Sequence, residues 1–137
     1  MGNVSVVITG GNKGLGAVIS QLILDESKWN IISISRTPTE DTTLRKNPRF
    51  TEFLYDLSNH QELDELCKQI FYKNNVIGLV NNAAIAYDEI ITNASGSELS
   101  TMLAVNCIAP SILVKWMIRA SIVHKGEKSI VNIGSVS

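Results

Sequence analysis

The feature of this chain that most limits its fold is a regular alternation between short apolar runs and longer segments of helical periodicity. The runs are rich in β-branched residues and span 5–9, 31–35, 50–55, 76–80 and 129–133. Each run is too short for a stable helix, and such runs are typical of strands covered on both faces. Strands that alternate with helices are joined by right-handed crossovers into a parallel sheet. The pattern therefore predicts an α/β fold with a doubly wound parallel sheet of about five strands.

The segments between the runs carry the signals of helices and loops. Residues 15–23 predict a helix with one apolar stripe, formed by Leu15, Val18, Ile19, Leu22 and Ile23. Ser58 and Gln61 have the spacing of a capping box, which predicts the start of the next helix. A long helix is expected from Ser97 toward a stop at 125–126. The polar stretch 36–49 contains two prolines and is predicted to be a loop.

Length and charge exclude several classes of protein. At 137 residues, 45% of them hydrophobic, the chain fits one soluble domain over 1–137. A net charge of −1 gives no electrostatic reason to expect nucleic acid or an anionic membrane as a partner. Residues 101–123 are largely apolar, but Asn106, Pro110, Lys115 and Arg119 interrupt them. Because such residues are unfavourable at mid-membrane, we expect a buried helix and no membrane span.

The cysteines and the N-terminus bear on the compartment. Cys67 and Cys107 both lie in apolar helical patterns, which predicts buried free thiols and suits a reducing cytosol. The N-terminus has no basic segment, and its apolar run over 4–8 is too short for a signal peptide. We therefore expect a cytoplasmic protein, and no metal site is predicted.

Glycines and polar residues gather where the predicted strands end, which is where open parallel sheets bind ligands. The first strand is followed by Thr-Gly-Gly-Asn-Lys-Gly-Leu-Gly, residues 9–16. Glycines at 10, 14 and 16 allow a tight turn, close approach of the backbone to a diphosphate, and close packing of helix on strand. The N-terminus of the following helix favours an anion. The turn predicts nucleotide binding, and because Lys13 precedes its glycine rather than following it, an NTPase is disfavoured.

The end of the second predicted strand bears on which dinucleotide is bound. An NAD site usually has a carboxylate there for the ribose 2′-hydroxyl. Here the strand ends in Ser35-Arg36, and the nearest carboxylate, Glu40, lies further along the loop. A guanidinium pairs well with phosphate, and Lys13 can approach the same region from the glycine turn. Two cations and no carboxylate predict NADP(H) in preference to NADH.

Five motifs in this order resemble the short-chain dehydrogenase/reductase family, whose members have a Rossmann-type fold. They are the glycine turn, Asp56-Leu57, Asn81-Asn82-Ala83-Ala84, Asn106, and Ile-Val-Asn-Ile-Gly-Ser at 130–135. The family usually has glycine where this chain has Ala84, and we expect the extra methyl to be tolerated. The resemblance implies that Asp56 contacts the adenine ring. The cofactor-binding residues are then expected to be Gly10, Asn12, Lys13, Gly14, Leu15, Gly16, Ser35, Arg36, Asp56, Leu57, Asn82, Ala83 and Ala84.

The resemblance also implies a reaction, the transfer of hydride between nicotinamide and a carbonyl or alcohol substrate. Ser135 would bind the substrate oxygen, and Asn106 would hold a water in a proton relay. The family's proton donor is a tyrosine followed four residues later by a lysine, and none of the three tyrosines of this chain has that lysine. We therefore expect the N-terminal part of an NADP(H)-dependent oxidoreductase, inactive as given, with the missing pair beyond residue 137.

Three alternatives remain open at the level of sequence: this oxidoreductase, a naturally short non-catalytic NADP(H)-binding protein, and an interaction module that has lost its ligand. The family resemblance implies the strand order 3-2-1-4-5, with strand five at an open edge. We expect that edge and an uncovered helix over 98–124 to promote association, so that the chain is a homo-oligomer through this helix. The substrate cannot be identified from these residues.

Overall fold

The β-branched runs form the strands of one parallel sheet, as their pattern predicts. The computed structural model describes residues 3–135. Its strands are β1 (Val4–Thr9), β2 (Asn30–Ser35), β3 (Phe50–Leu54), β4 (Asn75–Asn81) and β5 (Ser129–Asn132). They pair in parallel in the order β3-β2-β1-β4-β5, which confirms the doubly wound, Rossmann-type fold and the predicted strand order.

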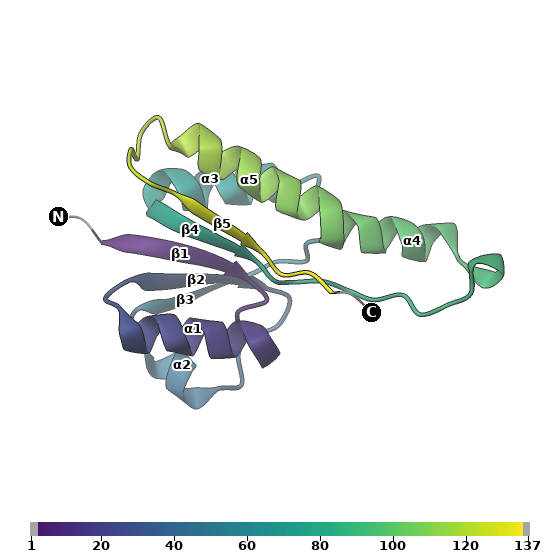
Figure 1. The fold of residues 1–137 in the computed structure, drawn as a ribbon, viewed down its shortest axis with the longest axis horizontal. Helices are drawn as coiled ribbons and strands as arrows, with labels where there is room; N and C mark the ends of the chain where they lie inside the picture. The colour runs from purple at the N-terminus through teal and green to yellow at the C-terminus, as the bar shows by residue number, and fades with distance from the viewer. Residues whose placement is uncertain (1–2, 136–137) are drawn as a thin grey trace.

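Helices cover both faces of the sheet (Figure 1). Helices α1 (Gly14–Glu26) and α2 (Thr42–Lys46) lie on one face, and α3 (Leu63–Lys73) and α5 (Ala109–Ala120) lie on the other. Helix α4 (Gly96–Leu103) leads through a π-helical turn, Ala104–Ile108, into α5. Figure 1 shows α4 extending past the carboxyl ends of the strands, so that it can contribute side chains to a site there.

Each face of the sheet has its own apolar core. The core on the α3 and α5 side is the larger, and its fully buried members include Val7, Ile34, Leu63, Cys67, Leu79, Ala109 and Leu113. The core on the α1 and α2 side contains Val6, Ile8, Leu24, Ile31, Leu44, Phe50 and Val80. Successive residues of β1 alternate between the two cores, which is how a strand covered on both faces becomes apolar throughout.

Helix α1 packs on the sheet through a stripe that matches the predicted one only in part, because Ile19 and Ile23 pack against the core and the other three predicted residues do not. Gly16, Ser20 and Leu24 are buried, whereas more than half of each of the predicted stripe residues Leu15, Val18 and Leu22 is exposed. The hydroxyl of Ser20 donates to the carbonyl oxygens of Gly11 and Gly16, at 3.2 and 2.9 Å. Small residues bring α1 against the glycine turn and the sheet, and Leu15, Val18 and Leu22 remain outside.

Two further predictions for the middle of the chain are wrong. The stretch 36–49 is not all loop, because the Asp41 carboxylate caps α2 by accepting from the N–H groups of Thr43 and Leu44. Leu44 is fully buried and anchors this short helix. Ser58 caps no helix: its N–H and hydroxyl both donate to Asp56, and α3 begins only at Leu63.

The long helix also departs from its predicted bounds. It begins at Gly96, where the hydroxyl of Ser95 accepts from the N–H of Glu98, and it ends at Ala120. Cys67 is buried as predicted, and burial raises the pKa of its thiol to about 12. Cys107 lies in the π-helical turn and is exposed, so its predicted burial is wrong. By length and composition alone, Gly96–Ala120 could cross a membrane, which is weak evidence for a span. Only 28% of its most apolar window is buried, so the expectation of a buried helix is wrong.

Strand β5 is an edge strand that hydrogen-bonds to β4 on one side. All its residues, Ser129–Asn132, are exposed. Two contacts hold its carboxyl end beside β4, because the Asn81 side-chain amide donates to Asn132 Oδ1 at 2.9 Å and the Ile133 N–H donates to the Asn81 carbonyl at 3.0 Å. The segment that follows is therefore fixed beside the end of β4.

Candidate active site

The glycine turn between β1 and α1 is built around positions where a side chain cannot be placed. Gly10 and Gly14 have φ angles of 68° and 56°, in the left-handed region that favours glycine. A Cβ at Gly16 would lie 1.9 Å from the carbonyl oxygen of Gly10, so no side chain fits there. The first N–H groups of α1 have no partner within the helix, and no side chain caps them. They and the positive end of the helix dipole are available to an anion.

Strand β4 ends against this turn. The hydroxyl oxygen of Thr9 accepts from the N–H groups of Asn82 and Ala83, at 3.0 and 2.9 Å. The side-chain amide of Asn82 in turn donates to the carbonyl oxygens of Thr9 and Gly10. Ala84 is exposed and has a negative φ, so an alanine is accommodated where the family usually has glycine.

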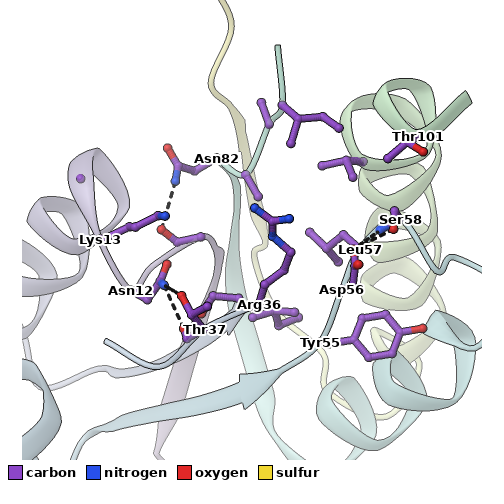
Figure 2. Close-up of a pocket in the computed structure, with 18 residues that line it drawn as sticks. Asn12, Lys13, Arg36, Thr37, Tyr55, Asp56, Leu57, Ser58, Asn82 and Thr101 are labelled. Carbon is purple, nitrogen blue, oxygen red and sulfur yellow. Dashed lines mark hydrogen bonds between the residues drawn. The ribbon is translucent and has the colours of Figure 1, made fainter. Parts of the chain in front are cut away.

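The ends of β1, β2, β3 and β4 surround a cavity of about 390 Å³, which also receives residues from α4 and the π-helical turn (Figure 2). Its volume is within the range of small-molecule sites. The lining residues are Gly10, Asn12, Lys13, Gly14, Ile34, Ser35, Arg36, Thr37, Tyr55, Asp56, Leu57, Ser58, Asn82, Ala83, Ala84, Ile85, Thr101 and Val105. Eleven of the predicted cofactor-binding residues are among them.

Four predicted site residues do not line the cavity. Gly16 lies beneath the turn, and Leu15 is exposed on α1. Asn106 lies in the π-helical turn behind the cavity, and Ser135 follows β5 and is exposed.

Charged groups of both signs face this cavity. Figure 2 shows the Arg36 guanidinium reaching into it, with Lys13 on one side and Asp56 on the other. Hydrogen bonds from the N–H and hydroxyl of Ser58, aided by the nearby charge of Arg36, lower the pKa of Asp56. Asp56 is therefore a carboxylate at neutral pH, fixed at the end of β3 as an acceptor. Arg36 and Lys13 remain to meet an anionic ligand.

Tyr55 is the tyrosine that lines the cavity, and its surroundings do not suit a proton donor. Its hydroxyl donates to the carbonyl oxygen of Asn59. Burial, followed by the charge of Glu62, raises the pKa of Tyr55 above its ordinary value. A catalytic tyrosine needs a lowered pKa, which a nearby cation supplies. The structure therefore agrees with the sequence in giving Tyr55 no such role.

Asn106 connects the π-helical turn to the loop after β4. Its side-chain oxygen accepts from the N–H of Ile85 at 2.9 Å, and its amide donates to the carbonyl of the same residue at 2.8 Å. The side chain is thus occupied in fixing Ile85, which lines the cavity. In a regular helix the carbonyl of Asn106 would accept from residue 110, but that residue is Pro110 and has no N–H. That carbonyl therefore has no α-helical donor.

Sequence reasoning missed seven lining residues: Ile34, Thr37, Tyr55, Ser58, Ile85, Thr101 and Val105. Five of these adjoin predicted residues at or just after strand ends and could have been included on that ground. Thr101 and Val105 come from the long helix, and no local pattern marks them. Among the residues that the structure describes, no group of three or more His, Cys, Asp or Glu side chains could hold a metal ion.

Residues 4–137 match the sequence profile of the short chain dehydrogenases. The chain belongs to this family. Among curated relatives it is 32% identical over 134 residues to a 3-oxoacyl-(acyl-carrier-protein) reductase of Buchnera aphidicola, covering 94% of this chain and 53% of the relative. It is 31% identical over 139 residues to a benzil reductase of Bacillus cereus, covering 95% of this chain and 55% of that enzyme. The chain thus spans about half the length of these short chain dehydrogenase relatives.

Solved structures of the same family agree with the fold. A 4-hydroxyisoleucine dehydrogenase complexed with NADH superposes with a TM-score of 0.87 at 26% identity, covering 98% of this chain and 56% of that one. A metagenomic short-chain oxidoreductase in complex with NADP gives a TM-score of 0.84 at 24% identity, covering 99% of this chain and 62% of that one. The chain therefore has the fold of the cofactor-binding part of a short chain dehydrogenase.

Proposed function

We propose that this chain binds NADP(H) as the cofactor-binding part of an oxidoreductase that interconverts a carbonyl and an alcohol. The observation that carries the proposal is the cavity at the strand ends, which combines a glycine turn, an uncapped helix N-terminus, and the cations Arg36 and Lys13. Relatives named as reductases of carbonyl substrates, and neighbours complexed with NADP or NADH, support it.

Each part of the dinucleotide has residues of matching chemistry. The N–H groups at the start of α1 suit the diphosphate. The apolar side chains of Leu57 and Val105, together with the Asp56 carboxylate, suit the adenine ring with its amino group. Arg36 and Lys13 suit a phosphate on the adenosine ribose, because a guanidinium offers paired donors and an ammonium adds a point charge. When bound, the nicotinamide supplies or accepts a hydride.

The residues proposed for the reaction lie near the ends of β4 and β5. Ser135 would donate its hydroxyl to the substrate oxygen, and the β4 contacts at Asn81 hold the strand that precedes it. Asn106 would act through its main chain, because its side chain is occupied by Ile85 while its carbonyl has no α-helical donor and can hold a water. This refines the relay role that the sequence predicts.

Cofactor preference tests the proposal. NADPH should bind the full-length protein about 10- to 150-fold more tightly than NADH, the value of one charge-assisted hydrogen bond. Arg36→Asp should reverse the order, and Lys28→Asp, an equal charge change on an exposed residue outside the cavity, should leave it unchanged. Titration by cofactor fluorescence measures both affinities. Equal affinities that Arg36→Asp does not alter would contradict the NADP(H) assignment.

The same site would also serve a non-catalytic NADP(H)-binding protein. Carbonyl-dependent oxidation of NADPH by the full-length protein separates the two functions.

We further propose a cytoplasmic protein and a homo-oligomer formed through the long helix, where Leu103, Ile108 and Ile118 are exposed. Exposed apolar side chains on one long helix favour association with a second copy.

A further inference from the structure

The glycine turn and the loop after β2 are held together by hydrogen bonds of two buried side chains, and one of these, Thr39, does not line the cavity. Thr39 is fully buried and Asn12 nearly so. The Thr39 hydroxyl donates to the Asn12 carbonyl at 2.7 Å. The Asn12 side-chain amide donates to the carbonyl and the hydroxyl oxygen of Thr37, at 2.9 and 3.2 Å. We call this set of contacts between Asn12, Thr37 and Thr39 the loop clamp.

Thr39 is itself held from three other directions. Its N–H donates to Glu52 of β3 at 2.8 Å, and its carbonyl accepts from the Arg45 guanidinium of α2 at 2.6 Å. Its hydroxyl oxygen also accepts from the N–H of Asp41 at 3.1 Å. Every polar atom of Thr39 therefore has a partner, and the residue joins the glycine turn to α2 and β3.

The loop clamp lies next to both cations of the cavity, Lys13 and Arg36, and can therefore affect the binding of an anionic ligand. Lys13 directly follows Asn12, and Arg36 directly precedes Thr37, so the clamp fixes the backbone from which both cations extend into the cavity. Affinity for a charged group depends on whether its partners are already in place, because ordering flexible side chains on binding opposes association. A free loop after β2 would leave Arg36 on mobile backbone.

We propose that Thr39 is a specificity-determining positioning residue, which holds Lys13 and Arg36 in place for the 2′-phosphate of the cofactor through the loop clamp. This inference rests on the NADP(H) function proposed above. A purely structural role for Thr39 would lower the stability of the fold and weaken NADPH and NADH alike. A positioning role weakens NADPH selectively, because only that cofactor carries the phosphate that the two cations meet.

Thr39→Val in the full-length protein tests the inference, because valine has the shape of threonine and lacks the hydroxyl. We expect the Kd for NADPH to rise by roughly 10-fold, in line with the partial loss of a charge-assisted contact, with little change for NADH. Thr39→Ser keeps the hydroxyl and should restore the wild-type ratio of the two Kd values. Thr43→Val makes the same exchange at an exposed threonine of α2 and serves as the control.

A second variant covers the case in which Thr39→Val does not fold. Glu52→Ala removes the acceptor of the Thr39 N–H from outside the cavity, and Glu52→Gln retains an acceptor oxygen. Glu52→Ala should weaken NADPH selectively, and Glu52→Gln should not. If folded Thr39→Val or Glu52→Ala keeps the wild-type preference for NADPH, the proposed role of the loop clamp in cofactor preference is overturned, and the NADP(H) function is not affected. Equal binding of both cofactors by the wild-type protein would refute the NADP(H) function and this inference with it.

Discussion

Replacing Gly16 by alanine tests the close packing of helix on turn that the site requires. The new Cβ would lie 1.9 Å from the Gly10 carbonyl oxygen and 2.8 Å from the Asn82 side-chain nitrogen. To reach ordinary contact, the carbonyl would have to move by about 1.5 Å, which would displace the turn or the start of α1. Because backbone must shift, we expect a loss of about 3 kcal/mol or more in the free energy of unfolding.

Two other glycines of the chain provide matched comparisons. Gly14 has open space around its Cβ position but a φ of 56°, so Gly14→Ala should lose only about 1–2 kcal/mol from backbone strain. Gly96 has open space and no positive φ at the start of α4, so Gly96→Ala should change stability by less than about 1 kcal/mol and in the favourable direction. Urea unfolding followed by circular dichroism gives all three values.

The expected loss of unfolding free energy is largest for Gly16→Ala, smaller for Gly14→Ala and absent for Gly96→Ala, and nucleotide titration adds a second measurement. Gly16→Ala should also abolish dinucleotide binding where it still folds, since the displaced turn no longer presents its N–H groups. A Gly16→Ala protein as stable as Gly96→Ala would show that the turn is not packed as the structure has it. The steric explanation of this glycine would then be refuted.

Two further predictions concern the outer helices. Hydrogen bonds from Lys115 and then from the Trp116 indole lower the pKa of Asp64, so its carboxylate stabilises the fold at neutral pH. Wild type should therefore have a higher urea midpoint than Asp64→Asn, and this difference should shrink as pH falls below about 4. A difference that does not change with pH would contradict the pairing. Ile118→Lys on the exposed side of α5 should reduce the assembly size measured by sedimentation velocity. Ile91→Lys, in the segment before α4, is the control and should not change it. A monomeric wild-type protein would refute association through the helix.

The sheet could be predicted because its central strands β1, β2 and β4 are covered on both faces, which makes their sequences largely apolar. Helix orientation could not be predicted in the same way. In α1 the larger residues Leu15, Val18 and Leu22 suggest a buried stripe, yet the helix approaches the sheet through Gly16 and Ser20. Periodicity identifies a helix, but it does not reveal that close contact with a glycine turn requires small residues.

The site could be predicted as far as it consists of strand ends and local turns. Gly10 and Arg36 directly follow β1 and β2, and Asp56 comes two residues after β3, so the parallel sheet alone brings them together. Ser58 resembled a helix cap because its spacing fits one, whereas the structure uses it to hold Asp56. Thr101 and Val105 could not be predicted, because they reach the cavity only through the direction in which α4 leaves α5.

The π-helical turn Ala104–Ile108 sets that direction by holding one residue more than a regular helical turn would. Each residue of an α-helix advances the chain by about 100° around its axis. Without the additional residue, α4 would be rotated by about this angle relative to α5, and Thr101 would turn away from the cavity. The side of α4 that faces the cavity is therefore set by the number of residues in this turn and not by side-chain chemistry. Deleting one residue from the turn would change the shape of this part of the site.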